Sequence, residues 1–141
     1  MAVSEDRTRA TVMALYDAFR RYDFDEVAAL LHPDIEWMIY RPIAIFPFAG
    51  PRRGRIAVLQ ALAVLVQGYR FESHKVDVLI VEGARAALIA DVGIQQRATE
   101  RSLRFRIVNF LRVVEGQIIE FREFADSFDL VEQALGRELT L

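Results

Sequence analysis

The most regular pattern of hydrophobic and polar positions in the chain lies between Leu103 and Asp126. Side chains alternate there with a period of two, which is typical of β-strands with one drier face and one more polar face. The pattern predicts two long strands joined at residues 114–116. Asn109 lies among the apolar positions of the first strand, and a carboxylate, Glu123, follows in the second. These two polar groups are the main reason to expect a functional site in this hairpin.

The face that carries Glu123 depends on the register of the hairpin, because a shift of one residue turns every side chain over. A two-residue turn would pair Asn109 with Arg122. A three-residue loop that ends in a left-handed glycine would pair Asn109 with Phe121 and Ile107 with Glu123. The second register separates apolar from polar side chains better. We therefore predict it, and it makes Glu123 an inward-facing carboxylate.

The remaining pattern predicts two helices, a strand and a third helix, followed by further strands and a short last helix. This order favours an α+β fold, in which a cone-shaped, curved antiparallel sheet carries three N-terminal helices on its concave face. Pockets commonly form in the apolar interior of such a cone. We expect residues 1–141 to form a single domain. The predicted helices cover residues 5–21, 26–31 (capped by Asp25), 55–66 and 127–135, and the predicted strands cover 35–40, 71–82, 85–96 and the 103–126 hairpin.

Residues 41–54 contain three of the four prolines and two of the seven glycines in the chain, with several large apolar side chains between them. These features predict a long loop. Leaving its apolar side chains in water would be costly. We therefore expect the loop to fold over the mouth of a cavity or into an interface, and the pattern leaves both alternatives open.

Composition narrows the function classes. The apolar share of 53% suggests extra buried surface, either a lined cavity or a subunit interface. A net charge of −2 offers no basic field for nucleic acid. The absence of cysteine excludes disulfides and thiolate metal sites and is compatible with the cytoplasm. No apolar run reaches the ~18 residues of a membrane span, and four charges in the first ten residues argue against a signal peptide. Two isolated histidines do not make a metal site, so we expect neither a metal nor a cofactor.

Several local patterns resemble the nuclear transport factor two-like superfamily and, within it, the SnoaL-like polyketide cyclase group. The resemblance spans nearly the whole chain and also rests on the order of the predicted elements. It implies the curved α+β cone, which is also called cystatin-like. The superfamily includes enzymes, carriers and assembly domains, so the resemblance implies the fold more strongly than the function. The matching patterns are residues 16–19 with 23–25, residues 31–37, Gly54 before the third helix, and residues 115–124 with Asp126.

The last hairpin is similar to that of the limonene-epoxide hydrolases. The resemblance places their acidic residue of this hairpin on Glu123 and their second catalytic aspartate near Asp91. The arginine that precedes that aspartate by two residues falls on Ile89 here, so the hydrolase arrangement is incomplete.

Two other enzyme branches give further expectations. The general base of the ketosteroid isomerases falls near Ile39 or Tyr40 and their buried acid near Val108 or Asn109, and none of these four is acidic here. The SnoaL-type cyclases use an inward acidic residue as acid and base. That resemblance implies the same role for Asp91 or Glu123, provided that the side chain faces the cavity.

Nine residues are candidates for the site. We expect Glu123 to carry the proton and Asp91 to be a second acid. Asn109 is expected to orient a substrate carbonyl or to hold Glu123 in place, and the alternative, a satisfied core amide, is the commoner role of a buried asparagine. The alternation around Asp91 favours an outward side chain, whereas the resemblance favours an inward one. The other six are expected to bind substrate: Tyr16, Trp37, Tyr40, His74, Ile107 and Phe121.

These observations predict a cofactor-independent acid–base enzyme of the isomerase, cyclase or hydratase/hydrolase type, acting on a small apolar metabolite. The alternatives are a non-catalytic binding protein for a hydrophobic small molecule and a structural dimerisation domain with a filled core. The outer sheet face mixes charge with aromatic residues as interfaces do, and this predicts a homodimer. That face carries Arg104, Arg106, Phe110, Arg112 and Phe124.

Overall fold

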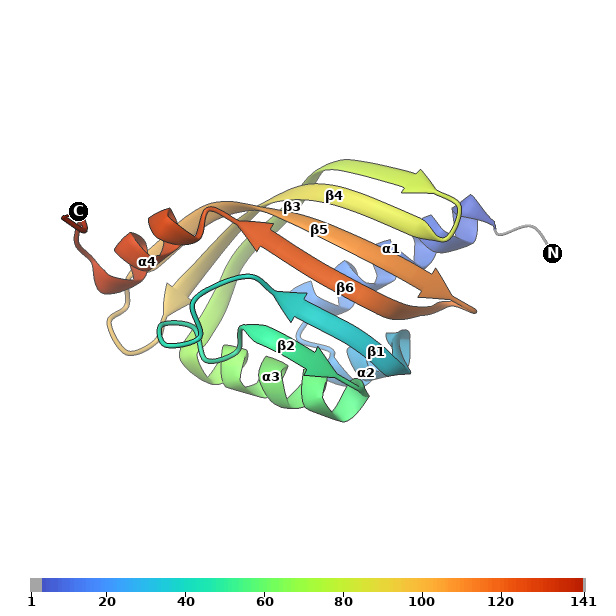
Figure 1. Cartoon of the computed structure of the whole chain (residues 1–141), viewed down its shortest axis with the longest axis horizontal. Coiled ribbons are helices and arrows are strands. Elements are labelled where there is room, and N and C mark those ends of the chain that lie inside the picture. The colour runs from blue at the N-terminus through green and yellow to red at the C-terminus, as the bar shows by residue number, and fades with distance from the viewer. Residues whose placement is uncertain (1–3, 141) are drawn as a thin grey trace.

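The computed structural model describes residues 4–140. Four helices and six strands lie within this part of the chain (Figure 1). The helices are α1 (Glu5–Arg20), α2 (Phe24–Leu30), α3 (Arg55–Gly68) and α4 (Ser127–Leu135). The strands are β1 (Leu31–Ile39), β2 (Gly50–Arg53), β3 (Tyr69–Glu82), β4 (Arg85–Gln96), β5 (Ser102–Val114) and β6 (Gln117–Ala125).

All six strands form one curved sheet in the order β2-β1-β6-β5-β4-β3. The pairs from β6 to β3 are antiparallel, as predicted, but β1 runs parallel to β6. The prediction of a purely antiparallel sheet is therefore wrong at this one pair. Most of the chain lies between β1 and β6, and no hairpin turn connects them. No local sequence signal therefore fixes their relative direction.

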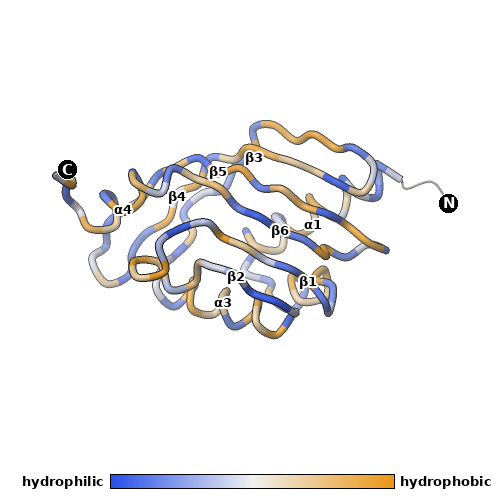
Figure 2. Tube along the Cα trace, in the orientation of Figure 1, coloured by the Kyte–Doolittle hydropathy of each residue, from blue (hydrophilic) through white to orange (hydrophobic). Residues whose placement is uncertain are grey.

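Helices cover the concave face of the sheet, which confirms the predicted α+β cone. Figure 1 shows α1, α2 and α3 gathered on one side of the bent strands, with α4 at one end. Val12, Leu15 and Tyr16 of α1 are buried in the common core. Figure 2 shows hydrophobic colour recurring along the long strands, where polar positions interrupt it. This alternation lets one face of each strand enter the core while the other stays outside.

The β5–β6 hairpin departs from the predicted register. Val114 pairs with Gln117, so the turn has two residues, both with positive φ, and the irregularity lies further along β6, where it shifts the pairing by one residue. Glu123 consequently pairs with Asn109 instead of Ile107. The predicted and observed partners differ by two positions. Because side chains alternate with a period of two, this shift keeps Glu123 on the face that the sequence predicted.

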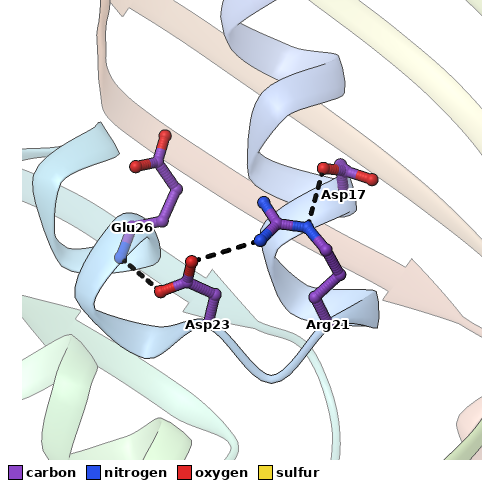
Figure 3. A network of polar contacts seen from close by, with 4 residues as sticks. All are labelled: Asp17, Arg21, Asp23 and Glu26. Atoms are coloured by element: carbon purple, nitrogen blue, oxygen red, sulfur yellow. Dashed lines mark hydrogen bonds and ion pairs between the residues drawn. The ribbon is translucent and has the colours of Figure 1, made fainter.

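A polar network fixes the junction between α1 and α2 (Figure 3). The guanidinium of Arg21 donates to the carboxylates of Asp17 at 3.0 Å and Asp23 at 3.2 Å. Asp23 also accepts a hydrogen bond from the backbone N–H of Glu26 and caps α2. The predicted cap, Asp25, is wrong, since it lies inside the first turn of the helix.

The loop of residues 41–54 folds back onto the core. Phe46 and Phe48 are buried, and the last residues of the loop form the short edge strand β2, which the sequence pattern did not predict. Ile43 remains 54% exposed. The loop therefore covers part of the interior between β1 and α3, close to the inward face of β6.

Candidate functional site

A pocket of about 240 Å³ lies between the helices and the concave face of the sheet. Its walls come from α1, α3, the 41–54 loop and every strand except β2, and most of the lining side chains are apolar. A few polar groups are set into this apolar lining, which is the usual composition of small-molecule sites. Six of the nine candidate residues belong to this wall: Tyr16, Trp37, His74, Ile107, Phe121 and Glu123.

Two carboxylates line the pocket: Glu72, which is exposed, and Glu123, which is largely buried. The side chain of Glu123 is 13% exposed, because the β6 alternation that buries Phe121 also turns Glu123 inward. Its Oε2 accepts a hydrogen bond from Arg41 Nη2 at 2.6 Å, and its Oε1 accepts one from Asn109 Nδ2 at 3.1 Å. Two donors therefore fix the carboxylate, and one of them is a cation that balances its charge.

Asn109 is fully buried on β5, directly opposite Glu123. Its Oδ1 accepts a short hydrogen bond, 2.6 Å, from the hydroxyl of Tyr16 on α1. Burial is the main cause that raises the pKa of Tyr16 well above its ordinary value, and the charge of Glu123 acts in the same direction. Tyr16 is thus a phenol at neutral pH and can act as a donor. The result is a chain of two hydrogen bonds, in which Tyr16 donates to Asn109 and Asn109 donates to Glu123.

His74 on β3 stacks against the ring of Tyr16, with ring centroids 4.9 Å apart. Burial lowers the pKa of His74, the charge of Arg20 lowers it further, and Glu123 opposes the shift. The imidazole is therefore neutral at neutral pH. Its Nδ1 is buried without a hydrogen-bond partner among the described residues.

Flat aromatic rings form another part of the wall. The indole of Trp37 stacks on Phe121, with ring centroids 3.9 Å apart and the planes inclined by 11°. These residues lie side by side on β1 and β6, and Ile39 and Glu123 form the next inward pair along the same strands. The aromatic pair is therefore adjacent to the carboxylate.

Arg41 is the functional group that the sequence reasoning missed. Its side chain is only 5% exposed, and its guanidinium lies near the rings of Phe105 at 5.2 Å and Phe48 at 5.9 Å. A signal for it existed: Trp37 and Ile39 face inward, so continuing that alternation by two positions places residue 41 inward as well. The loop composition concealed the signal, because the proline that follows suggested that the strand had ended.

Three candidates are not part of the pocket wall: Asn109, which is buried against Glu123, and Asp91 and Tyr40, which face outward. Asp91 is on the outer face of β4, where its carboxylate forms an ion pair with Arg106 at 3.0 Å and both side chains are 58% exposed. The expectation of a second acid at Asp91 is therefore corrected, and the simple alternation had placed it rightly. Tyr40 also faces outward: its hydroxyl accepts a hydrogen bond from Arg122 at 2.8 Å, and its ring stacks on Phe124.

Two classes of feature are not found in the described part of the chain. Within residues 4–140, no group of three or more histidine, aspartate or glutamate side chains could hold a metal ion. Over the same residues, no helix is both long enough and apolar enough to cross a membrane.

Comparison with known proteins gives a consistent result. Residues 12–121 match the profile of the SnoaL-like domain family. A presumed isomerase from Rhodopseudomonas palustris is similar in structure, with 32% sequence identity and a TM-score of 0.81, and the match covers 89% of this chain and 93% of that one. No curated protein matches the chain at a significant level.

More distant structures share the fold. An epoxide hydrolase from M. tuberculosis, described as similar to limonene-epoxide hydrolase, is 20% identical with a TM-score of 0.75, over 94% of this chain and 92% of that one. A presumed ketosteroid isomerase from Kribbella flavida is 22% identical with a TM-score of 0.66, over 87% and 80% of the two chains. At these identities the likeness shows the architecture alone.

Proposed function

Because the chain belongs to the SnoaL-like domain family, we propose that its pocket converts a small apolar molecule by acid–base chemistry, with Glu123 as the proton carrier. This fold is typical of small isomerases, cyclases and hydrolases that work without a cofactor. The observation that carries the proposal is a fixed carboxylate, 13% exposed, in the wall of a mostly apolar pocket.

The proposed step is a proton transfer to the carboxylate of Glu123. A C–H bond of the substrate breaks, the proton forms an O–H bond on Glu123, and the electron pair stays with the substrate. Return of the proton to another carbon gives an isomer. Attack of the carbanion on a second carbonyl carbon of the substrate gives a ring, and the resulting alkoxide takes the proton back from Glu123. Each carboxylate oxygen accepts only one hydrogen bond from a described residue, so a lone pair remains for the proton.

Asn109 and Tyr16 would hold this carboxylate in place. Both polar atoms of the Asn109 side chain are engaged, one by Tyr16 and the other by Glu123. Of the two roles expected for Asn109, this geometry therefore favours holding Glu123 over orienting a substrate carbonyl. A fixed base can be aligned with the breaking bond at low entropic cost.

Hydrogen–deuterium exchange tests the proposal without knowledge of the natural substrate. Small ketones with acidic α-protons, 1-tetralone first, would be followed by NMR in D2O near neutral pD. The protein should accelerate α-proton exchange, and Glu123→Gln should remove the acceleration while the fold remains intact by circular dichroism. Asp91→Asn, a carboxylate-to-amide change on the outer face, is the matched control and should exchange like the wild type. Equal acceleration by Glu123→Gln would rule out Glu123 as the base.

A non-catalytic binding protein is the second candidate, because both oxygens of Glu123 already have donors and its charge is balanced by Arg41. Binding of the ketones with no accelerated exchange across the panel would favour this function. A structural domain with a filled core fits less well, since a pocket remains between the sheet and the helices.

We also propose that the outer sheet face forms a homodimer. Phe124 is 43% exposed and Val108 is 41% exposed, and they are direct neighbours across β5 and β6. Val78 of β3 lies on the same face and is 40% exposed. Arg106 and Arg112 flank this apolar row. Sedimentation equilibrium should give twice the chain mass, and a monomer mass independent of concentration would contradict the proposal.

A cytoplasmic location remains our proposal as well, supported by the absence of cysteine.

A further inference from the structure

The guanidinium of Arg41 is only partly used by the protein. Nη2 donates to Glu123, but Nε is buried with no hydrogen-bond partner among residues 4–140. Nη1 likewise donates to no described residue, although it is not fully buried. Buried charged groups normally have their hydrogen-bonding capacity filled, because an unpaired donor loses its hydration without replacement. Nε is fully enclosed, so Nη1 is the unfilled donor of this pocket-lining side chain that a ligand can reach.

The position of Arg41 relative to Glu123 strengthens this argument. Arg41 lies two positions after the inward Ile39, which is the β1 partner of Glu123. Arg41 and Glu123 both belong to the pocket wall. The rings of Phe48 and Phe105 flank the guanidinium and hold it beside the carboxylate. A molecule in the pocket can therefore meet the carboxylate and the guanidinium at the same time.

We propose that Arg41 binds an oxygen atom of the substrate through Nη1, so that the ligand is a small apolar molecule carrying a hydrogen-bond-accepting oxygen, such as a ketone. This inference rests on the pocket being the ligand site, as proposed above, but binding through Arg41 does not require that Glu123 be a base.

This arrangement would keep the charges in the pocket balanced before and after the proton transfer. Before reaction, the positive charge of Arg41 is balanced by the carboxylate of Glu123. When the proton moves from substrate carbon to Glu123, the carboxyl becomes neutral and the negative charge resides on the substrate oxygen. Arg41 then balances that oxygen, and no uncompensated charge arises at any point in the apolar pocket. Such compensation matters most where the surroundings screen charge poorly.

The test compares two probes that differ by one oxygen, 1-tetralone and its hydrocarbon counterpart tetralin, with affinities measured by ligand-observed NMR. Removing Arg41 alone would leave the buried carboxylate of Glu123 without its cation and its shortest hydrogen bond, whereas the amide oxygen of Glu123→Gln can still accept from Arg41. The comparison is therefore made between Glu123→Gln and the double variant Glu123→Gln/Arg41→Met. The matched control is Glu123→Gln/Arg106→Met, which makes the same side-chain change on the outer face, where Arg106 is 58% exposed.

The preference for ketone over hydrocarbon should fall by about tenfold or more when Arg41 is removed, which is the usual effect of losing a hydrogen bond from a charged donor. The Arg106 control should leave the preference unchanged. An unchanged preference in the Arg41 double variant would overturn the inference but leave the exchange experiment on Glu123 unaffected. Failure of the wild type to bind either probe would overturn both proposals.

If the double variant does not fold, the test is made on the wild type instead, by following its guanidinium ¹⁵N resonances in an NMR titration. They are assigned with Arg41→Lys, which keeps the positive charge. Addition of 1-tetralone should shift the Arg41 signals and addition of tetralin should not. Equal shifts with both probes would count against a bond to the ketone oxygen.

Discussion

Substitution of Tyr16 by phenylalanine is the sharpest test of the polar chain behind Glu123. The change keeps the ring, and with it most of the packing and the stack on His74, but deletes the hydroxyl that donates to Asn109 at 2.6 Å. Asn109 is fully buried, so its Oδ1 would be left without a donor. Leaving a buried acceptor unpaired costs about 1–3 kcal/mol. We therefore expect Tyr16→Phe to lower the free energy of unfolding by about 2 kcal/mol.

This loss is measurable by urea and thermal unfolding. In a chain of 141 residues, 1 kcal/mol changes Tm by roughly 3–4 °C, so the expected decrease is about 7 °C. Tyr22→Phe is the matched control, since Tyr22 is 39% exposed and its hydroxyl accepts a hydrogen bond from the backbone N–H of Phe71. Water can replace that bond, so the control should lose no more than about 0.5 kcal/mol. Equal stability losses in the two variants would refute the expected cost of leaving the buried Asn109 oxygen without a donor.

The same substitution has a signature at high pH. The folded state raises the pKa of Tyr16 above its ordinary value of 10.0, so the unfolded chain releases this proton first. The native state then binds more protons than the unfolded state, and stability falls as pH rises above about 10. Tyr16→Phe should lack this part of the fall. An identical slope in wild type and variant would show that Tyr16 ionises as easily in the folded state.

The remaining predictions concern other positions. Because the fold lowers the pKa of His74 below its ordinary value of 6.5, the unfolded chain binds this proton first, and stability should decrease as pH falls below about 6.5. His74→Phe should flatten that decrease in urea titrations at pH 7 and pH 5, and an unchanged slope would exclude His74 as its source. Asp91→Ala breaks an exposed pair and should cost no more than about 1 kcal/mol in urea unfolding; a larger loss would contradict its placement on the solvent side. Phe124→Glu should convert the proposed dimer to a monomer in sedimentation experiments without lowering α-proton exchange per chain, and an unchanged dimer would show that the outer face is not the interface.

The sequence alone determined most of the architecture. Period-two alternation gave the long antiparallel strands and helical spacing gave the helices, because one face of each element must leave water. Even the orientation of Glu123 followed from the sequence, although the predicted register was wrong by two positions, since such a shift returns every side chain to the same face. Simple alternation also predicted that Asp91 faces outward, where the resemblance to enzymes suggested the opposite.

Only the tertiary structure decided which groups surround Glu123. Arg41 reaches it across 82 positions of sequence, from a loop whose composition gives no sign of a buried cation. Tyr16 reaches Asn109 across 93 positions, through the packing of α1 on the sheet. The parallel pairing of β1 with β6, which places Trp37 on Phe121, likewise has no local signal. Periodicity reports which way a side chain points, but contacts between distant segments depend on how helices and strands pack together.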